Sequence, residues 1–494
     1  MMGDPVSVQL VLVSHTNNGK TTLTRTLLGA DVGEVRDAAH VTISSTEHVL
    51  LKTPQGDALH LWDTPGFGDS VRLLGRLGMS DNPIGWFLRE VFDRYRDRTF
   101  WLSQQALRTA RDAADVVLYL VNASESPQDA GYLEAEMQIL AWLGKPVLVL
   151  LNQVGPPRPE KEDSAESAMW RAAMDRFPLV QEILPLDAFA RCWVHERVFY
   201  NAVGALLPRD SDAGYRRLLE AWRTSNADRF EKAMRLSAAL LARAARETEP
   251  VDAVDQSFLR TALRTAGIGR NPQQRRQARA METLVSRLEQ DSARTSVALM
   301  SIYRLDPGAA TTINSRVRDN FVVRMPIDET HAGLLGAIIS GATTGVTADL
   351  LAGGLTAGIG AVIGSVLGAA TFIGAARGFN ATTDRSVPTV AFADPFMRSL
   401  VVTGILRYLA IIHFGRGRGK FTESEAPAFW CEHVEQEVTL REGALKEAWK
   451  AVRGDSDPEH AVRHLQPLIT EIAIATIGRL YAQADLKAEF QQRG

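Results

Sequence analysis

The sequence predicts an α/β domain with a mostly parallel sheet and flanking helices, followed by a mainly α-helical domain with a glycine-zipper hairpin. Short apolar segments of strand length recur at 10–13, 58–62, 116–121 and 146–151, and polar or helix-forming segments separate them. This alternation is typical of parallel sheets. From Tyr215 to Ser301, apolar residues recur mostly at spacings of three and four or their multiples, as they do on one face of a helix.

Length, charge and cysteine content limit the class of protein. A chain of 494 residues has room for roughly two to four domains. The 55 Lys and Arg residues against 58 Asp and Glu, with a pI near 6.4, provide no basic field for nucleic acid, so no nucleic-acid partner is favoured. Cys192 and Cys431 lack metal-ligand spacing, and the N-terminus lacks the features of a secretory signal. These features favour a cytoplasmic protein.

The segment Ser14–Thr22 is predicted to be a phosphate-binding loop. It follows an apolar strand, runs into a helix and matches the pattern G-x-x-x-x-G-K-[ST], except that Ser14 replaces the first glycine. In such loops the glycine lets the backbone approach the phosphates, the lysine reaches the β- and γ-phosphates, and the threonine hydroxyl faces Mg²⁺. The residues expected at a bound nucleotide are Asn17, Asn18, Gly19, Lys20, Thr21 and Thr22.

A second motif, Asp63-Thr64-Pro65-Gly66, follows the strand at 58–62. A carboxylate at the carboxyl end of a buried strand can hold the hydration shell of Mg²⁺, and the Gly66 N–H can meet the γ-phosphate. The connector before it is expected to be a nucleotide-sensing switch, in which Thr42 is the first choice for the hydroxyl that closes on Mg²⁺ and the γ-phosphate. The alternatives to Thr42 are Ser44, Ser45 and Thr46. The order of the two motifs predicts a P-loop nucleoside triphosphatase with Lys20, Thr42, Asp63 and Gly66 at the reaction centre.

The pair of motifs Asn17-Asn18-Gly19-Lys20-Thr21 and Asp63-Thr64-Pro65-Gly66 resembles the Era, TrmE and septin branch of translation-factor-class GTPases. The resemblance covers about residues 6–208 and implies GTP and GDP as ligands, with Mg²⁺. In that branch an asparagine two positions before Gly-Lys helps to bind an activating K⁺, and Asn17 falls on that position. Phe67 stands where Ras-like enzymes have a catalytic glutamine. The resemblance therefore implies slow hydrolysis by the protein alone, accelerated by K⁺, by a homodimer formed through the G domain, or by a partner.

The base-binding loops depart from the GTPase pattern. Asn152-Gln153-Val154-Gly155 stands where these enzymes have Asn/Thr-Lys-x-Asp, so the carboxylate that accepts from guanine is missing. A site without that acceptor loses much of its discrimination for guanine. Asp187 and Ala188 are candidates for the last base-contacting loop, with Asp187 in place of the missing carboxylate. The choice between guanine and adenine stays open at this stage.

The segment Gly333–Ala376 differs in composition from the rest of the chain. Of its 44 residues, eleven are glycine and Asp349 is the only charged one. Its glycines recur at intervals of four, which lets two helices touch closely. A hairpin that enters one leaflet of a membrane or is stored until a trigger releases it, and a soluble hairpin buried in the helical domain, are both compatible with the pattern. The predicted domains are 1–208 (GTPase), 209–330 (helical, first part), 331–380 (glycine-rich hairpin) and 381–494 (helical, second part).

This order also resembles bacterial GTPases that carry an uncharacterised C-terminal domain with a glycine-rich segment. The predicted function is a GTP-binding and GTP-hydrolysing switch that depends on Mg²⁺, is stimulated by K⁺, and associates reversibly with the inner face of the cell membrane or with an integral membrane protein. One alternative is a soluble ribosome-assembly GTPase. The other is a nucleotide-binding scaffold with little turnover, which the substitutions Ser14 and Phe67 suggest.

Overall fold

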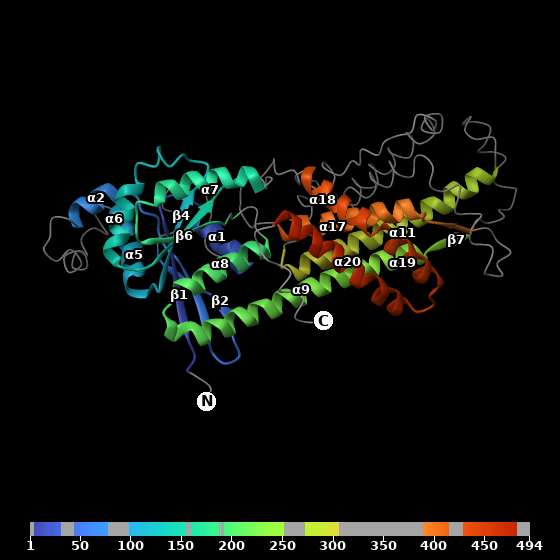
Figure 1. Cartoon of the computed structure of the whole chain (residues 1–494), viewed down its shortest axis with the longest axis horizontal. Coiled ribbons are helices and arrows are strands. Elements are labelled where there is room, and N and C mark those ends of the chain that lie inside the picture. The colour runs from blue at the N-terminus through green and yellow to red at the C-terminus, as the bar shows by residue number, and fades with distance from the viewer. Residues whose placement is uncertain are drawn as a thin grey trace. The chain divides into compact units, whose positions relative to one another are not determined.

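The computed structural model divides into two compact units, which are described separately (Figure 1). The structure describes residues 4–30, 44–77, 98–154, 160–186, 188, 192–250, 272–305, 389–413 and 428–481. The first unit comprises 1–228 with 412–424, and the second comprises 229–411 with 425–494. The first is an α/β unit and the second is mainly helical, so the predicted fold class is confirmed.

The first unit is built on a six-stranded sheet in the order β2-β3-β1-β4-β5-β6. Its strands are β1 (Ser7–Ser14), β2 (Thr46–Lys52), β3 (Ala58–Asp63), β4 (Val116–Asn122), β5 (Val147–Asn152) and β6 (Val180–Pro185). β2 pairs with β3 in antiparallel fashion, and all the other neighbours are parallel. β4 and β5 read as nearly continuous apolar runs because helices cover both faces of a parallel sheet, and every residue of β5 is buried.

Alternate residues of β1 belong to the two faces of the sheet. Val11 and Val13 join the core cluster that also contains Phe100 and Trp170 from the covering helices. Leu10 and Leu12 are fully buried as well but lie outside that cluster, because successive strand side chains point to opposite faces. The helices of this unit are α1 (Lys20–Leu28), α2 (Ser70–Leu77), α5 (Arg98–Ala113), α6 (Leu133–Leu143), α7 (Glu160–Met174) and α8 (Trp193–Leu206).

The helical unit is a bundle around α17 (Asp394–Ile412). Its remaining elements are α9 (Asp212–Arg246, which follows the 3-10 turn η1 at Arg209–Ser211 and is shared with the first unit), α11 (Pro272–Ile302), α18 (Ala428–Leu440), α19 (Glu442–Gly454), α20 (Pro458–Leu480), β7 (Thr248–Pro250) and β8 (Thr389–Ala391). The Tyr408 ring of α17 is fully buried and packs edge-on against Phe230 and Tyr303. The predicted hairpin at 331–380 lies outside the described residues, and the domain limits inferred from the sequence stay predictions.

Among the described residues, α17 is the one helix whose length and composition would let it cross a membrane, and 78% of its apolar window is buried inside the protein. The central helix of a bundle needs the same apolar composition, because all of its sides meet other helices. Packing within the unit therefore accounts for the apolar sequence of α17.

Asp57 ties the β2–β3 turn to the start of β1 and to α9 within the first unit. Its side chain is fully buried. Asp57 Oδ2 accepts from Arg217 Nε at 2.8 Å, and Asp57 Oδ1 accepts from Arg217 Nη2 at 2.6 Å. The Val6 N–H and the Thr53 hydroxyl also donate to it, at 3.0 and 2.8 Å. The bidentate contact with the Arg217 guanidinium holds the pKa of Asp57 well below its usual range.

Replacing Asp57 with Asn should lower the free energy of unfolding by about 1.5–3 kcal/mol, because charge-assisted hydrogen bonds are lost in a buried site. Since the pKa is lowered in the folded state, this contribution is present in full above the usual aspartate pKa of about 4 and is lost progressively as the pH falls below that value toward the folded-state pKa. Urea unfolding at pH 7 and at about pH 3 measures both effects. Asp210→Asn, at an exposed position, is the control. Equal stability of Asp57→Asn and the parent at pH 7 would contradict this role.

Candidate nucleotide-binding site

The loop between β1 and α1 has a backbone that requires glycine at its end. Gly19 has φ 88°, and a Cβ atom there would lie 2.7 Å from Asn152 Nδ2. The exposed Asn17 also has a positive φ of 68°, a conformation that asparagine tolerates better than most residues. No side chain among the described residues caps the N-terminus of α1. Its first N–H groups can therefore bind an anion such as a phosphate.

Ser14, which replaces the first glycine of the motif, supports the lysine. Lys20 Nζ donates to Ser14 Oγ at 2.8 Å, and Ser14 Oγ donates to the His15 carbonyl at 2.6 Å. Burial lowers the pKa of Lys20 to about 8, and the negative charges of Asp63 and Glu136 partly oppose this shift. The ammonium group is thus a buried cation at neutral pH, which is a suitable partner for a phosphate.

Thr21 and Asp63 lie together, as the motifs predict. The Thr21 hydroxyl donates to Asp63 Oδ2 at 2.7 Å. Asp63 ends β3 and is 4% exposed, and its Oδ1 atom is buried without a hydrogen-bond partner among the described residues. Burial raises the pKa of Asp63, with the Thr21 hydrogen bond opposing it. A hydroxyl and a carboxylate with one unsatisfied buried oxygen are oxygen ligands of the kind that Mg²⁺ prefers. These residues therefore fit the metal.

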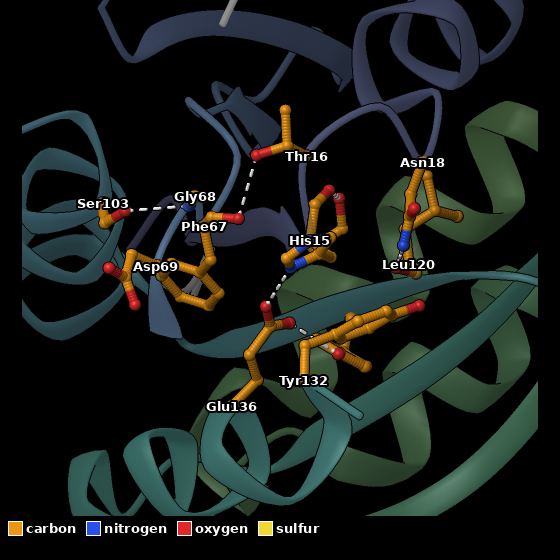
Figure 2. A network of polar contacts seen from close by, with 12 residues as sticks. His15, Thr16, Asn18, Phe67, Gly68, Asp69, Ser103, Leu120, Tyr132 and Glu136 are labelled. Carbon is orange, nitrogen blue, oxygen red and sulfur yellow. Dashed lines mark hydrogen bonds and ion pairs between the residues drawn. The ribbon is translucent and has the colours of Figure 1, made fainter. Parts of the chain in front are cut away.

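Gly66 lies directly against the phosphate loop. A Cβ atom at this position would be 2.8 Å from Thr16 Cα and 3.1 Å from Lys20 Nζ, so a side chain would displace the lysine or the loop. The next residue, Phe67, donates its N–H to the Ser14 carbonyl at 2.9 Å, and its carbonyl accepts from the Thr16 N–H at 3.1 Å. Figure 2 shows the 2.9 Å bond from the Thr16 hydroxyl to the same carbonyl. The Phe67 ring is fully buried and so cannot orient an attacking water.

Asn152, at the carboxyl end of β5, connects three loops. Its Nδ2 atom donates to the Asn18 carbonyl at 2.8 Å, and its Oδ1 atom accepts from the Ala188 N–H at 2.9 Å. The Asn18 amide in turn donates to the Leu120 carbonyl at 3.1 Å. Asn152 is fully buried, so both of its polar atoms are used to fix backbone groups.

Four residues that the motif search did not identify form a network behind the loop (Figure 2). His15 Nδ1 lies 2.8 Å from Glu136 Oε1, and the Tyr119 hydroxyl donates to Glu136 Oε2 at 2.7 Å. The His15 ring stacks on Tyr132, with 4.0 Å between centroids and 11° between planes. Glu136 is fully buried, and burial raises its pKa while the His15 hydrogen bond opposes the shift. A glutamate among the apolar residues of 133–143 is the sequence signal that could have identified it.

The predicted site residues thus fall into four sets. Lys20, Thr21, Asp63 and Gly66 lie around one point, and Asn18, Gly19, Asn152 and Ala188 lie at the neighbouring loops. Thr22 is buried in α1, while Gln153 adopts a positive φ of 59° just after β5. Thr42 and Asp187 lie outside the described residues, so their roles stay predictions.

Comparison with known families assigns both parts of the chain. A family described as "50S ribosome-binding GTPase" matches residues 9–153, and one described as "Domain of unknown function (DUF3482)" matches residues 171–466, more than half of the chain. The chain belongs to the DUF3482 family. Its N-terminal unit contains a P-loop GTPase domain, as the two motifs predict. No curated protein matches this DUF3482 protein.

Solved structures resemble the GTPase part of the DUF3482 protein at low identity. Era in complex with MgGDPNP and a segment of 16S ribosomal RNA is 21% identical over 42% of this chain and 58% of its own, with a TM-score of 0.31. Era from Aquifex aeolicus bound to GDP.AlF4⁻ is 22% identical over 41% and 58%, with a TM-score of 0.31. Toc33 from Arabidopsis thaliana, as a dimerization-deficient mutant, is 16% identical over 38% and 72%, with a TM-score of 0.25. The match therefore spans less than two thirds of each Era chain.

In this DUF3482 protein, Asn152→Ala should weaken nucleotide binding at least tenfold, because the Asn18 carbonyl and the Ala188 N–H lose their partner and the loop loses its fixed geometry. Titration with a fluorescent guanine nucleotide measures the change. Asn122→Ala is the matched control, since Asn122 is the register partner of Asn152 on β4 and its Oδ1 accepts locally, from the N–H and hydroxyl of Ser124. Equal losses in both variants would show that Asn152 has no special role.

Proposed function

We propose that the protein is a Mg²⁺-dependent GTPase switch whose hydrolysis is slow in the protein alone and is stimulated by K⁺. The observation that carries the proposal is the convergence of Lys20, Thr21, Asp63 and Gly66 at the N-terminus of α1. The ligands proposed are GTP and GDP. Asn17 is the proposed K⁺ ligand, and a homodimer through the G domain is a second proposed route to faster hydrolysis.

In the proposed reaction, a water attacks the γ-phosphate, and the chain supplies positive groups where negative charge accumulates. Lys20 meets the β- and γ-phosphate oxygens, and the loop N–H groups meet the remaining oxygens. Thr21 and Asp63 would hold Mg²⁺, which neutralises phosphate charge when bound. Gly66 would donate its N–H to the γ-phosphate because no side chain shields it. Since Phe67 is a core residue, the water needs an orienting group other than the residue after the Asp-x-x-Gly motif.

Lys20→Ala should reduce GTP affinity by at least tenfold and abolish phosphate release, because the buried cation that pairs with the phosphates is removed. Parallel titrations with GTP and ATP decide the base preference, and phosphate release in K⁺ and in Na⁺ buffers tests stimulation by K⁺. Lys145→Ala, at a partly exposed position after α6, is the control. Unchanged GTP binding by Lys20→Ala would refute the assignment of the loop, and no phosphate release from GTP by the parent in either buffer would leave the scaffold alternative.

We also propose that the protein is cytoplasmic and associates reversibly with the inner face of the cell membrane, or with an integral membrane protein, through residues 331–380. The supporting observation is compositional: a stretch of 44 residues with one charge and eleven glycines favours apolar surroundings.

An RNA-binding role is the second candidate, because the family that matches residues 9–153 is described as ribosome-binding. The low net charge of the chain is the argument against it, and a local basic surface would be enough to bind RNA despite that balance.

Flotation with anionic liposomes separates the two candidates. The full-length protein should float, and Val362→Asp, in the glycine-rich segment, should reduce the floated fraction several-fold because a charge is costly in an apolar medium. Val297→Asp, at a position in α11 that is 46% exposed, should float like the parent. Sedimentation with ribosomes and no flotation in either nucleotide state would favour the second candidate.

A further inference from the structure

The helical unit contains an arginine in the C-terminal half of its central apolar helix. Arg407, in α17, is 4% exposed, and burial lowers its pKa to about 10. The guanidinium is therefore charged at neutral pH. Among the described residues, no hydrogen bond or ion pair is made to it. An unpaired charge in a protein interior is strongly unfavourable.

Two half-buried arginines of this unit show the usual arrangement. Arg441 pairs with Glu437 and with Glu471, the latter at 3.0 Å, and Arg453 pairs with Asp394 at 2.7 Å. Arg407 is more deeply buried than either, and it lacks a carboxylate among the described side chains. The charge needs a counter-charge that the described part of the bundle does not supply.

Arg407 lines a cavity between α9, α11, α17 and α20. The cavity has a volume of about 10 Å³, which is room for one group about the size of a water molecule. Most of its wall is apolar, including Leu240, Leu299 and Ile469. The other polar residues that line it are Ser237 and Thr295, which are 6% and 4% exposed.

The two hydroxyls can adapt to what occupies the cavity. Ser237 Oγ donates to the Ala233 carbonyl at 3.0 Å, and Thr295 Oγ1 donates to the Asp291 carbonyl at 2.8 Å. A hydroxyl rotates about its C–O bond, so either proton can instead turn toward an acceptor in the cavity. An anion beside Arg407 would then receive hydrogen bonds from the guanidinium and from the hydroxyls, with apolar groups on the remaining sides.

We propose that this cavity is a binding site for a small monovalent anion, with chloride as its representative. The size of the cavity excludes phosphate, sulfate and larger carboxylates. The fixed guanidinium supplies the charge, and the two hydroxyls supply further donors. The bound anion would stabilise the bundle by removing the cost of an unpaired charge at its centre. The site is independent of the nucleotide site and of any turnover there.

The test compares thermal unfolding of the full-length protein in sodium chloride and in sodium gluconate at equal ionic strength. Gluconate is too large for the cavity, so the Tm of the parent should be roughly 2–4 °C higher in chloride. Arg407→Met should have the same Tm in both salts. It should also be at least as stable as the parent in gluconate, because an apolar side chain of similar length replaces an unpaired charge. Arg398→Met is the control: Arg398 is on the same helix but donates to the Thr439 hydroxyl near the surface, so this variant should keep the full difference between the salts.

A direct measurement accompanies the thermal one. A crystal soaked in sodium bromide should show an anomalous peak within hydrogen-bond distance of the Arg407 guanidinium. Equal melting in both salts without a bromide peak would overturn the proposal and leave a water in the cavity. A large loss of stability in Arg407→Met in both salts would also overturn it, because it would show that a carboxylate of the same chain neutralises Arg407.

Discussion

The nucleotide site depends on backbone groups of the phosphate loop being held by partners from other strands. Asn152 fixes the Asn18 carbonyl from β5, and Phe67 pairs with Ser14 and with Thr16 from the end of β3. Both contacts arise because β1 lies between β3 and β4 at the centre of the sheet, so the loop that leaves β1 meets segments from both sides. A loop held at fixed positions presents its N–H groups without an ordering cost when a ligand arrives.

The charges at the site are arranged for a ligand that carries charge of its own. Lys20 and Asp63 are both buried. Burial lowers the pKa of Lys20 and raises the pKa of Asp63, so it favours the neutral form of each group. A triphosphate beside the lysine and a divalent cation beside the aspartate would each stabilise the charged form of its partner. The charged forms of Lys20 and Asp63 are thus less stable without the ligands than with them. Binding of the ligands is therefore coupled to the stability of this unit.

Most of the fold of the first unit could be predicted from the sequence, because β4 and β5 are apolar runs and the two motifs sit at strand ends. The Lys20–Thr21–Asp63–Gly66 arrangement followed from those motifs. The role of Ser14 could not be predicted from the motif. The motif shows that a glycine is missing, but it does not show that the Ser14 hydroxyl accepts a hydrogen bond from Lys20. Glu136 could not be assigned either: its partners His15 and Tyr119 are distant in sequence and meet it only in the folded chain. The lack of a counter-charge at Arg407 could not be predicted either, because it depends on which side chains of α9, α11, α17 and α20 surround the guanidinium.

The buried ring of Phe67 has a consequence for how the first unit could switch. A side chain of this size contributes about 1.5–3 kcal/mol by staying out of water, and two backbone hydrogen bonds hold the same residue to the loop. The chain just after Gly66 is therefore held in place. A rearrangement that moved Phe67 would have to remove its aromatic ring from the core. A rearrangement on loss of the γ-phosphate that began at Gly68 would leave the Phe67 ring in place and would break the 3.0 Å bond from the Gly68 N–H to the Ser103 hydroxyl. Such a movement would reach α2, which begins at Ser70, and α5, which contains Ser103.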